Sequence, residues 1–319
     1  MEFRFGVGLW PPLAIAVVIG VCLALAGAGP TPAAAAGLMT WPDLLRRPMP
    51  VATERIAYGA DPLQFAELWL PAGPGPHPLV VMAHGGCWES RVAKTSIMNY
   101  LAEDLRRRGV AVWNLEYRGV DRPGGGYPGT FLDVADGADA GRRVARARHL
   151  DLTRVVVVGH SAGGHLALWL AARGGLKPES PLYRRHPLAI ATAISLGGLP
   201  DLAAAMTPPT DTCGDEAPAR LVGEAKPGRP SVYADTSPPE MAPPKARVVL
   251  VNADQDPIAP PGFAAAYVAR VSARGPAPET HVITGEGHVE LIAPGSHAWE
   301  VERGLIEAAL GRGPVSAKP

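Results

Sequence analysis

The chain has 319 residues, with 30 basic and 30 acidic side chains, and 47% of its residues are hydrophobic. This length and composition suit one large domain. The zero formal net charge argues against a nucleic-acid partner, because phosphate binding requires a basic face. No run of like charges marks a membrane-surface patch, and the oligomeric state stays open.

The first 36 residues are predicted to be a secretory signal peptide. Arg4 precedes a charge-free apolar run over residues 7–29, and Ala34-Ala35-Ala36 offers a small-residue cleavage site. Cleavage there leaves residues 37–319 as a single domain of a secreted or periplasmic protein, with no stable membrane partner. The alternative is an uncleaved membrane anchor, since about 20 apolar residues can span a bilayer. Prolines in the run and its Ala-rich end favour cleavage.

After this region, strands and helices alternate along the chain. This alternation predicts an α/β fold with a mostly parallel sheet and helices on both faces. The loops that follow parallel strands then meet at one sheet edge, where α/β active sites lie. Strands are predicted at 53–58, 66–70, 78–83, 110–115, 154–158, 189–196, 247–251 and 281–284, and helices at 96–108, 130–148 (with Thr130 as N-cap), 165–173, 261–274 and 299–310.

The stretch from about 200 to 244 interrupts the alternation and is rich in Pro, Ala, Asp and Gly. We interpret it as a cap inserted before the penultimate strand. It contains Cys213, which with Cys87 makes two cysteines in the mature chain. In an exported protein these two can form a disulfide, and two free thiols are the alternative.

A nucleophile elbow is predicted at Gly159-His160-Ser161-Ala162-Gly163, between the strand 154–158 and a helix. The turn is sharp, so glycines are needed where a side chain would clash. Ser161 is the candidate nucleophile. The backbone N–H of Ala162, at the helix N-terminus, can donate to an oxyanion. A plain glycine-rich turn is the structural alternative.

A second loop, His84-Gly85-Gly86-Cys87-Trp88, follows the strand 78–83. A His-Gly-Gly loop in this place brings backbone N–H groups close to a developing oxyanion. Gly86 and Cys87 are the candidate donors. His84 and Gly85 are predicted to support the loop rather than to act as a base.

A nucleophilic serine needs a base, and the base needs an orienting carboxylate. Asp254 and Asp256 both follow the strand 247–251, and Asp256, further into the loop, is favoured as the acid. His288 follows the last strand behind Gly285-Glu286-Gly287 and is the candidate base. This gives the chain order Ser, Asp, His.

The other histidines show no spacing typical of a zinc site, and no nucleotide-binding fingerprint is present. His160 and His165 are five residues apart, without a nearby set of Cys or Glu ligands. We therefore expect neither a metal nor another cofactor.

These motifs resemble the α/β-hydrolase superfamily, over residues from about 50 to 311 and in the expected order. The branch most similar is the esterase/lipase and kynurenine formamidase-like group, which carries a His-Gly-Gly-x-Trp oxyanion loop. The chain departs from that pattern at Asn252-Ala253, where relatives often have His-Gly, and at Cys87, where one branch has a third glycine. The resemblance implies an α/β-hydrolase fold.

The resemblance and the motifs together predict a carboxylesterase-type serine hydrolase that acts on a small-molecule ester through an acyl-enzyme. Short acyl chains are expected, because no long apolar lid is visible. An arylformamidase and a serine peptidase are the alternatives within the hydrolases. A non-catalytic binding module is the alternative from another class, and it usually lacks one of the three residues that are all present here.

Overall fold

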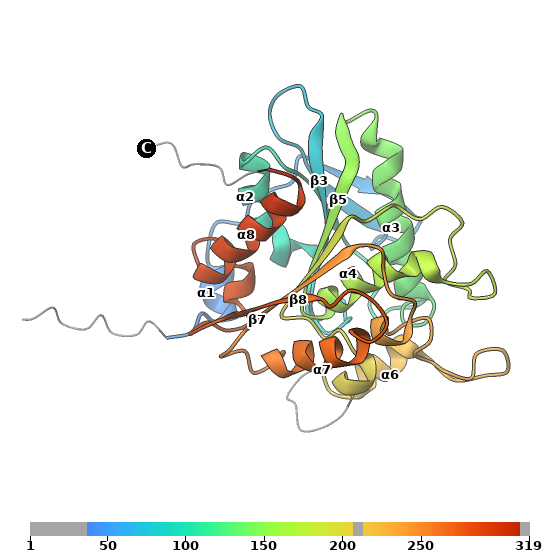
Figure 1. Cartoon of the computed structure of the whole chain (residues 1–319). Helices are drawn as coiled ribbons and strands as arrows, with labels where there is room; N and C mark the ends of the chain where they lie inside the picture. Colours follow the sequence, from blue (N-terminus) through green and yellow to red (C-terminus); the bar gives the residue numbers. More distant parts are fainter. Residues whose placement is uncertain (1–36, 207–212, 313–319) are drawn as a thin grey trace, which may run out of the picture. The chain divides into compact units, whose positions relative to one another are not determined.

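The structure is a computed structural model that describes residues 37–206 and 213–312, so the predicted signal peptide lies outside the described residues. At its centre is an eight-stranded sheet in the order β1-β2-β4-β3-β5-β6-β7-β8. Figure 1 labels β3, β5, β7 and β8 of this sheet, which run through the middle of the picture. The strands are β1 (Glu54–Ala57), β2 (Phe65–Trp69), β3 (His77–Ala83), β4 (Ala111–Leu115), β5 (Leu150–His160), β6 (Thr192–Leu196), β7 (Arg247–Ala253) and β8 (Glu279–Ile283).

The sheet is antiparallel only at one end, where β1 pairs with β2 and β2 with β4. The other five pairings are parallel. The parallel strands are apolar runs because both of their faces are covered. The predicted α/β-hydrolase fold, with its mostly parallel sheet, is therefore confirmed.

Helices cover both faces of the sheet, and successive strand residues alternate between two cores. Val81 of β3 packs in one core with residues of α3, α4 and α7, whereas its neighbour Val80 packs in the other core with residues of α2 and α8. Figure 1 shows α2 and α8 on one side of the sheet and α3 and α4 on the other. The helices are α1 (Trp41–Leu45), α2 (Asn99–Arg107), α3 (Gly129–Ala145), α4 (Ala162–Ala172), α5 (Leu202–Ala205), α6 (Glu216–Val222), α7 (Pro261–Val271) and α8 (His297–Ala309).

The predicted N-cap of α3 is wrong. The helix begins at Gly129, and Pro128 occupies the cap position. The Thr130 hydroxyl instead donates to the carbonyl of Arg118 and accepts from the N–H of Gly126. Because Thr130 is the second residue inside the helix, its hydroxyl is not at the cap position.

The segment predicted as a cap holds α5, α6 and a 3-10 helix, η3 (Pro238–Glu240), between β6 and β7. Its later part is tied to the hydrophobic core by buried polar contacts. His165 and Trp169 of α4 bond to the carbonyls of Thr236 and Asp235, at 2.8 and 2.9 Å. The carboxylate of Asp235 accepts from the hydroxyl of Tyr127 at 2.8 Å. These contacts hold the segment against α4 and the loop before α3.

No helix within the described ranges is long and apolar enough to cross a membrane.

Candidate active site

Ser161 lies in the turn between β5 and α4, with the backbone angles φ 57° and ψ −124°. Few non-glycine residues adopt such a conformation, because it brings Cβ close to the backbone. Its N–H donates to the carbonyl of Leu196 on β6 at 2.9 Å, and its carbonyl accepts from Gly164 at 2.8 Å. The turn thus places Ser161 at the carboxyl edge of the parallel strands.

Two glycines make this turn sterically feasible. A Cβ on Gly159 would lie 1.9 Å from the carbonyl oxygen of Gly163, and one on Gly163 would lie 2.1 Å from that of Ala83. Both distances are far below van der Waals contact. The glycine spacing read from the sequence therefore reflects a close backbone approach between the elbow and the end of β3.

The loop behind β3 lies directly beside this turn. A Cβ on Gly85 would lie 2.8 Å from the Cβ of Ser161. Gly86, Cys87 and Trp88 follow with φ angles of 98°, 53° and 56°. Within the described residues, the N–H groups of Gly86, Cys87 and Ala162 donate to no protein acceptor. Such unpaired donors near a serine can stabilise a developing oxyanion.

Cys87 of this loop forms a disulfide with Cys213, with the two Cα atoms 5.2 Å apart. The predicted bridge is therefore present. It joins the oxyanion loop candidate to the start of the segment that carries α6. Cys213 itself packs against the core on the α3 and α4 face.

His84 is buried and held by a network of hydrogen bonds below the loop. Its Nε2 lies 2.9 Å from Oε1 of Glu116, and its Nδ1 lies 2.7 Å from the carbonyl of Gly85. Its ring stacks on Tyr117, whose hydroxyl donates to the His84 carbonyl at 2.8 Å. Burial opposes ionisation of Glu116, but His84 and the N–H groups of Thr95 and Tyr117 lower its pKa below the ordinary value. Both ring nitrogens of His84 therefore have hydrogen-bonding partners that hold the loop.

Asp256 and His288 form a buried pair at the ends of β7 and β8. Nδ1 of His288 lies 2.6 Å from Oδ2 of Asp256. The other carboxylate oxygen accepts from the N–H groups of Ile258 and Ala259, at 2.8 and 2.9 Å. Burial raises the pKa of Asp256, but these partners, His288 first among them, outweigh it and lower the pKa below the ordinary value. The pair is arranged as an ionised carboxylate that orients an imidazole.

Asp254, the competing acid, points elsewhere. Its side chain is exposed, and its Oδ1 accepts from the N–H of Gly285 at 2.8 Å. It braces the turn that follows β8 and does not contact His288.

The elbow motif includes His160, to which the sequence assigned no role, and the structure packs its ring against the candidate base. Its Nε2 lies 3.0 Å from the carbonyl oxygen of His288, and the two rings are 4.3 Å apart. Because the acceptor is a carbonyl, Nε2 carries the proton and donates. Burial and the charge of His288 lower the pKa of His160 to about 3, so it stays neutral.

Gly197, directly after β6, was also missed by the sequence analysis. Its φ is +49°, and an added Cβ would lie 3.0 Å from Oδ2 of Asp256 and 3.1 Å from Nδ1 of His288. A side chain there would intrude on the buried pair. A glycine at the end of a predicted strand gives no such signal, because the conflict depends on two distant loops.

Across residues 37–206 and 213–312, no group of three or more His, Cys, Asp and Glu side chains could hold a metal ion.

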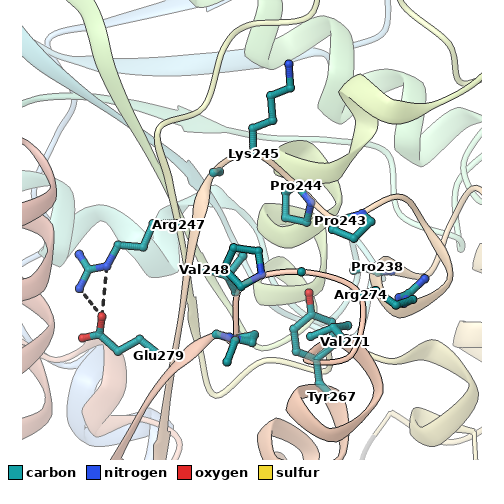
Figure 2. Close-up of a pocket in the computed structure, with 15 residues that line it drawn as sticks. Pro238, Pro243, Pro244, Lys245, Arg247, Val248, Tyr267, Val271, Arg274 and Glu279 are labelled. Carbon is teal, nitrogen blue, oxygen red and sulfur yellow. Dashed lines mark hydrogen bonds and ion pairs between the residues drawn. The ribbon is translucent and has the colours of Figure 1, made fainter.

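A separate pocket of about 360 Å³ lies at the opposite edge of the sheet (Figure 2). Arg247 and Glu279, the first residues of β7 and β8, form an ion pair beside it. Since β7 and β8 are parallel, their first residues lie at the far edge from the loops that carry Asp256 and His288. None of the candidate catalytic residues lines this pocket.

The chain is similar in sequence to one protein family and in structure to several esterases. A model of the BD-FAE family matches residues 67–267. No curated protein sequence matches the chain. A truncated form of a carbohydrate esterase from gut microbiota superimposes with a TM-score of 0.65 at 18% identity, covering 81% of this chain and 95% of that one.

Two further solved structures are similar over most of their length. Esterase B from Lactobacillus Rhamnosis (HN001) has a TM-score of 0.68 at 18% identity, over 82% of this chain and 87% of that one. The thermophilic esterase Est2 from the Planctomycetes species Thermogutta terrifontis has a TM-score of 0.65 at 19% identity, over 85% of this chain and 96% of that one. The structural similarity therefore covers the fold of most of the chain.

Proposed function

Because the chain belongs to the BD-FAE family, an esterase family of the α/β-hydrolase type, we propose that it is a carboxylesterase-type serine hydrolase with Ser161, His288 and Asp256 as its triad. The observation that carries this proposal is the buried 2.6 Å contact between His288 and Asp256 at the sheet edge that also bears the strained Ser161 turn. A turn with a purely structural role would not require a serine, a histidine and a buried carboxylate at the same edge of the sheet.

The proposed reaction begins with proton transfer from the Ser161 hydroxyl. Nδ1 of His288 donates to Asp256, so Nε2 is left with a lone pair and accepts this proton as Ser161 attacks the ester carbonyl. The N–H groups of Ala162 and of Gly86 or Cys87 stabilise the oxyanion. The imidazolium then protonates the leaving alcohol. Water attacks the acyl-enzyme with His288 as base and releases the acid.

The proposed substrates are small carboxylic esters with short acyl chains. Structures of similar fold support this choice: one of the Thermogutta esterase has propionate bound, and one of the Lactobacillus esterase involves a tributyrin phosphonate. The same Thermogutta enzyme is phosphonylated by sarin, as expected for a reactive serine. We further propose export, guided by residues 1–36, with cleavage before Gly37.

Covalent labelling tests the nucleophile directly. We expect a fluorophosphonate probe to label the wild type and the Ser272→Ala control, in which an exposed serine at the end of α7 is changed, but not Ser161→Ala. Equal labelling of Ser161→Ala would contradict the proposal. A panel of p-nitrophenyl esters of increasing acyl length, run beside N-formylkynurenine, separates an esterase from a formamidase. We expect turnover of the shortest esters to dominate.

A further inference from the structure

The loop that carries His288 contains no regular secondary structure apart from the three-residue 3-10 helix η4 (Glu290–Ile292). This base loop, residues 285–296, begins with Gly285 at φ +78° and contains Gly287 and Gly295. Glycines give the backbone more freedom than other residues do. A triad base must nevertheless be held within a fraction of an ångström, so the loop needs support from elsewhere in the chain.

That support comes from the segment that precedes β1. Trp41, the first residue of α1, lies edge-on to His288 with the ring centroids 6.4 Å apart, and edge-on to His160 at 6.2 Å. The indole thus contacts both the candidate base and the residue next to Ser161.

A buried carboxylate joins the same two parts of the chain. One oxygen of Glu290 accepts from the N–H of Met39, and the other accepts from the N–H of Gly287 at 3.1 Å. Gly287 directly precedes His288. At the far end of the loop, the Arg47 guanidinium donates to the carbonyl of Pro294 at 2.9 Å.

The segment is an ordered element with its own anchors. Thr40 and Asp43 form a reciprocal capping box at the start of α1, which fixes its first turn. Leu44 is fully buried in the core beside α2 and α8. We define residues 38–47 as the N-terminal brace.

We infer that the N-terminal brace positions the catalytic base, with Trp41 as its principal positioning residue. The inference rests on the proposed function and adds a part of the site that the family match over residues 67–267 does not include. His288 is held by Asp256 at Nδ1, by His160 at its carbonyl and by the brace at its ring. The N–H of the preceding residue is held by Glu290, which in turn accepts from the N–H of Met39 in the brace. Without the brace, the His288 ring and Glu290 lose these contacts, and we expect Nε2 to lose its alignment with Ser161.

The test compares Trp41→Ala with Trp41→Phe and with Leu45→Ala, in which an exposed residue of the same helix is changed. Misplacing the base hinders protonation of a poor leaving group most. For an alkyl acetate we therefore expect Trp41→Ala to lower kcat about 10- to 100-fold with little change in KM. For p-nitrophenyl acetate, whose leaving group needs no proton, we expect a smaller loss. Trp41→Phe should restore most of the activity, and Leu45→Ala should match the wild type.

Hydrogen exchange of the base loop gives a readout that does not depend on turnover. We expect amides of residues 285–296 to exchange faster in Trp41→Ala, while those of the central strands keep their protection. Glu290→Gln replaces one carboxylate oxygen, which accepts a hydrogen bond, with an NH2 group, which donates. This variant should show the same faster exchange of the base loop, with less change in packing than Trp41→Ala.

The proposed role of the N-terminal brace would be contradicted if hydrogen exchange in the base loop were unchanged in both Trp41→Ala and Glu290→Gln. It would also be contradicted if Trp41→Ala lost activity equally on the two esters. If the wild type hydrolyses neither ester and binds no fluorophosphonate, the proposed function fails. The exchange measurement still decides in that case whether the segment braces the loop.

Discussion

Asp256 contacts His288 through a hydrogen bond of 2.6 Å, although the two residues are on different strand-end loops. Both side chains are almost fully buried. The contact leaves His288 with Nε2 as its only free ring nitrogen, which is the geometry that a general base toward Ser161 requires.

Removing the carboxylate charge should therefore impair catalysis far more than binding. For Asp256→Asn we expect kcat to fall about 10⁴-fold, because the amide no longer favours the Nδ1–H tautomer. Asp254→Asn is the matched control, since Asp254 is exposed and bonds to Gly285, and its activity should stay within a few-fold of the wild type. Steady-state kinetics on one ester checks both variants, and the reverse ranking would show that Asp254 is the acid.

Gly197 offers a test of the same pair from outside the triad. We expect Gly197→Ala to lower kcat by about 10- to 100-fold, because its Cβ would press on the Asp256–His288 contact and its φ of +49° disfavours alanine. Gly304→Ala, in the exposed face of α8 with no atom near its added Cβ, should keep full activity and gain about 0.5–1 kcal/mol of stability. Wild-type kinetics for Gly197→Ala would contradict the crowding argument.

The disulfide between Cys87 and Cys213 should contribute to both stability and activity. It closes a loop across a sequence separation of 126 residues, so we expect Cys213→Ser to lower the free energy of unfolding by about 2–4 kcal/mol. The kcat should also fall, because Cys87 would no longer tether the oxyanion loop.

Thiol titration in denaturant without reductant provides the control for this bridge. The chain has three cysteines, and the third, Cys22, lies in the predicted signal peptide. We expect one reactive thiol in the uncleaved chain and none after cleavage. Detection of two additional thiols would show that the bridge does not form.

Acid should destabilise the protein through a buried histidine. Burial lowers the pKa of His165 from 6.5 to about 4. The unfolded chain therefore binds this proton more readily, so stability is complete above pH 6.5 and falls as the pH drops towards 4, by about 3 kcal/mol.

His165→Gln keeps a donor for the carbonyl of Thr236 but does not titrate. We expect its unfolding free energy to depend less on pH between 7 and 4, by about the same 3 kcal/mol, in denaturant titrations. His186→Gln, at an exposed position, is the control and should follow the wild type. An unchanged pH dependence in His165→Gln would argue against a neutral buried ring.

Local features of the sequence were sufficient to predict the fold and the elbow. Apolar runs such as that of β5 indicate strands buried on both faces, and the glycines at 159 and 163 are needed wherever such a strand turns sharply into a helix. The order of the three candidate residues along the chain followed from the same alternation of elements. These patterns involve residues that are close together in the chain, so a single sequence is enough to recognise them.

Only the tertiary structure decided which groups meet at the end of the sheet. The choice between Asp254 and Asp256 depends on how the loop after β7 folds against His288, and the importance of Gly197 depends on both loops together. Trp41 contacts His288 from the opposite end of the domain sequence. A contact between distant segments leaves no local pattern of period or composition, so residue spacing alone could not reveal the support around the candidate base.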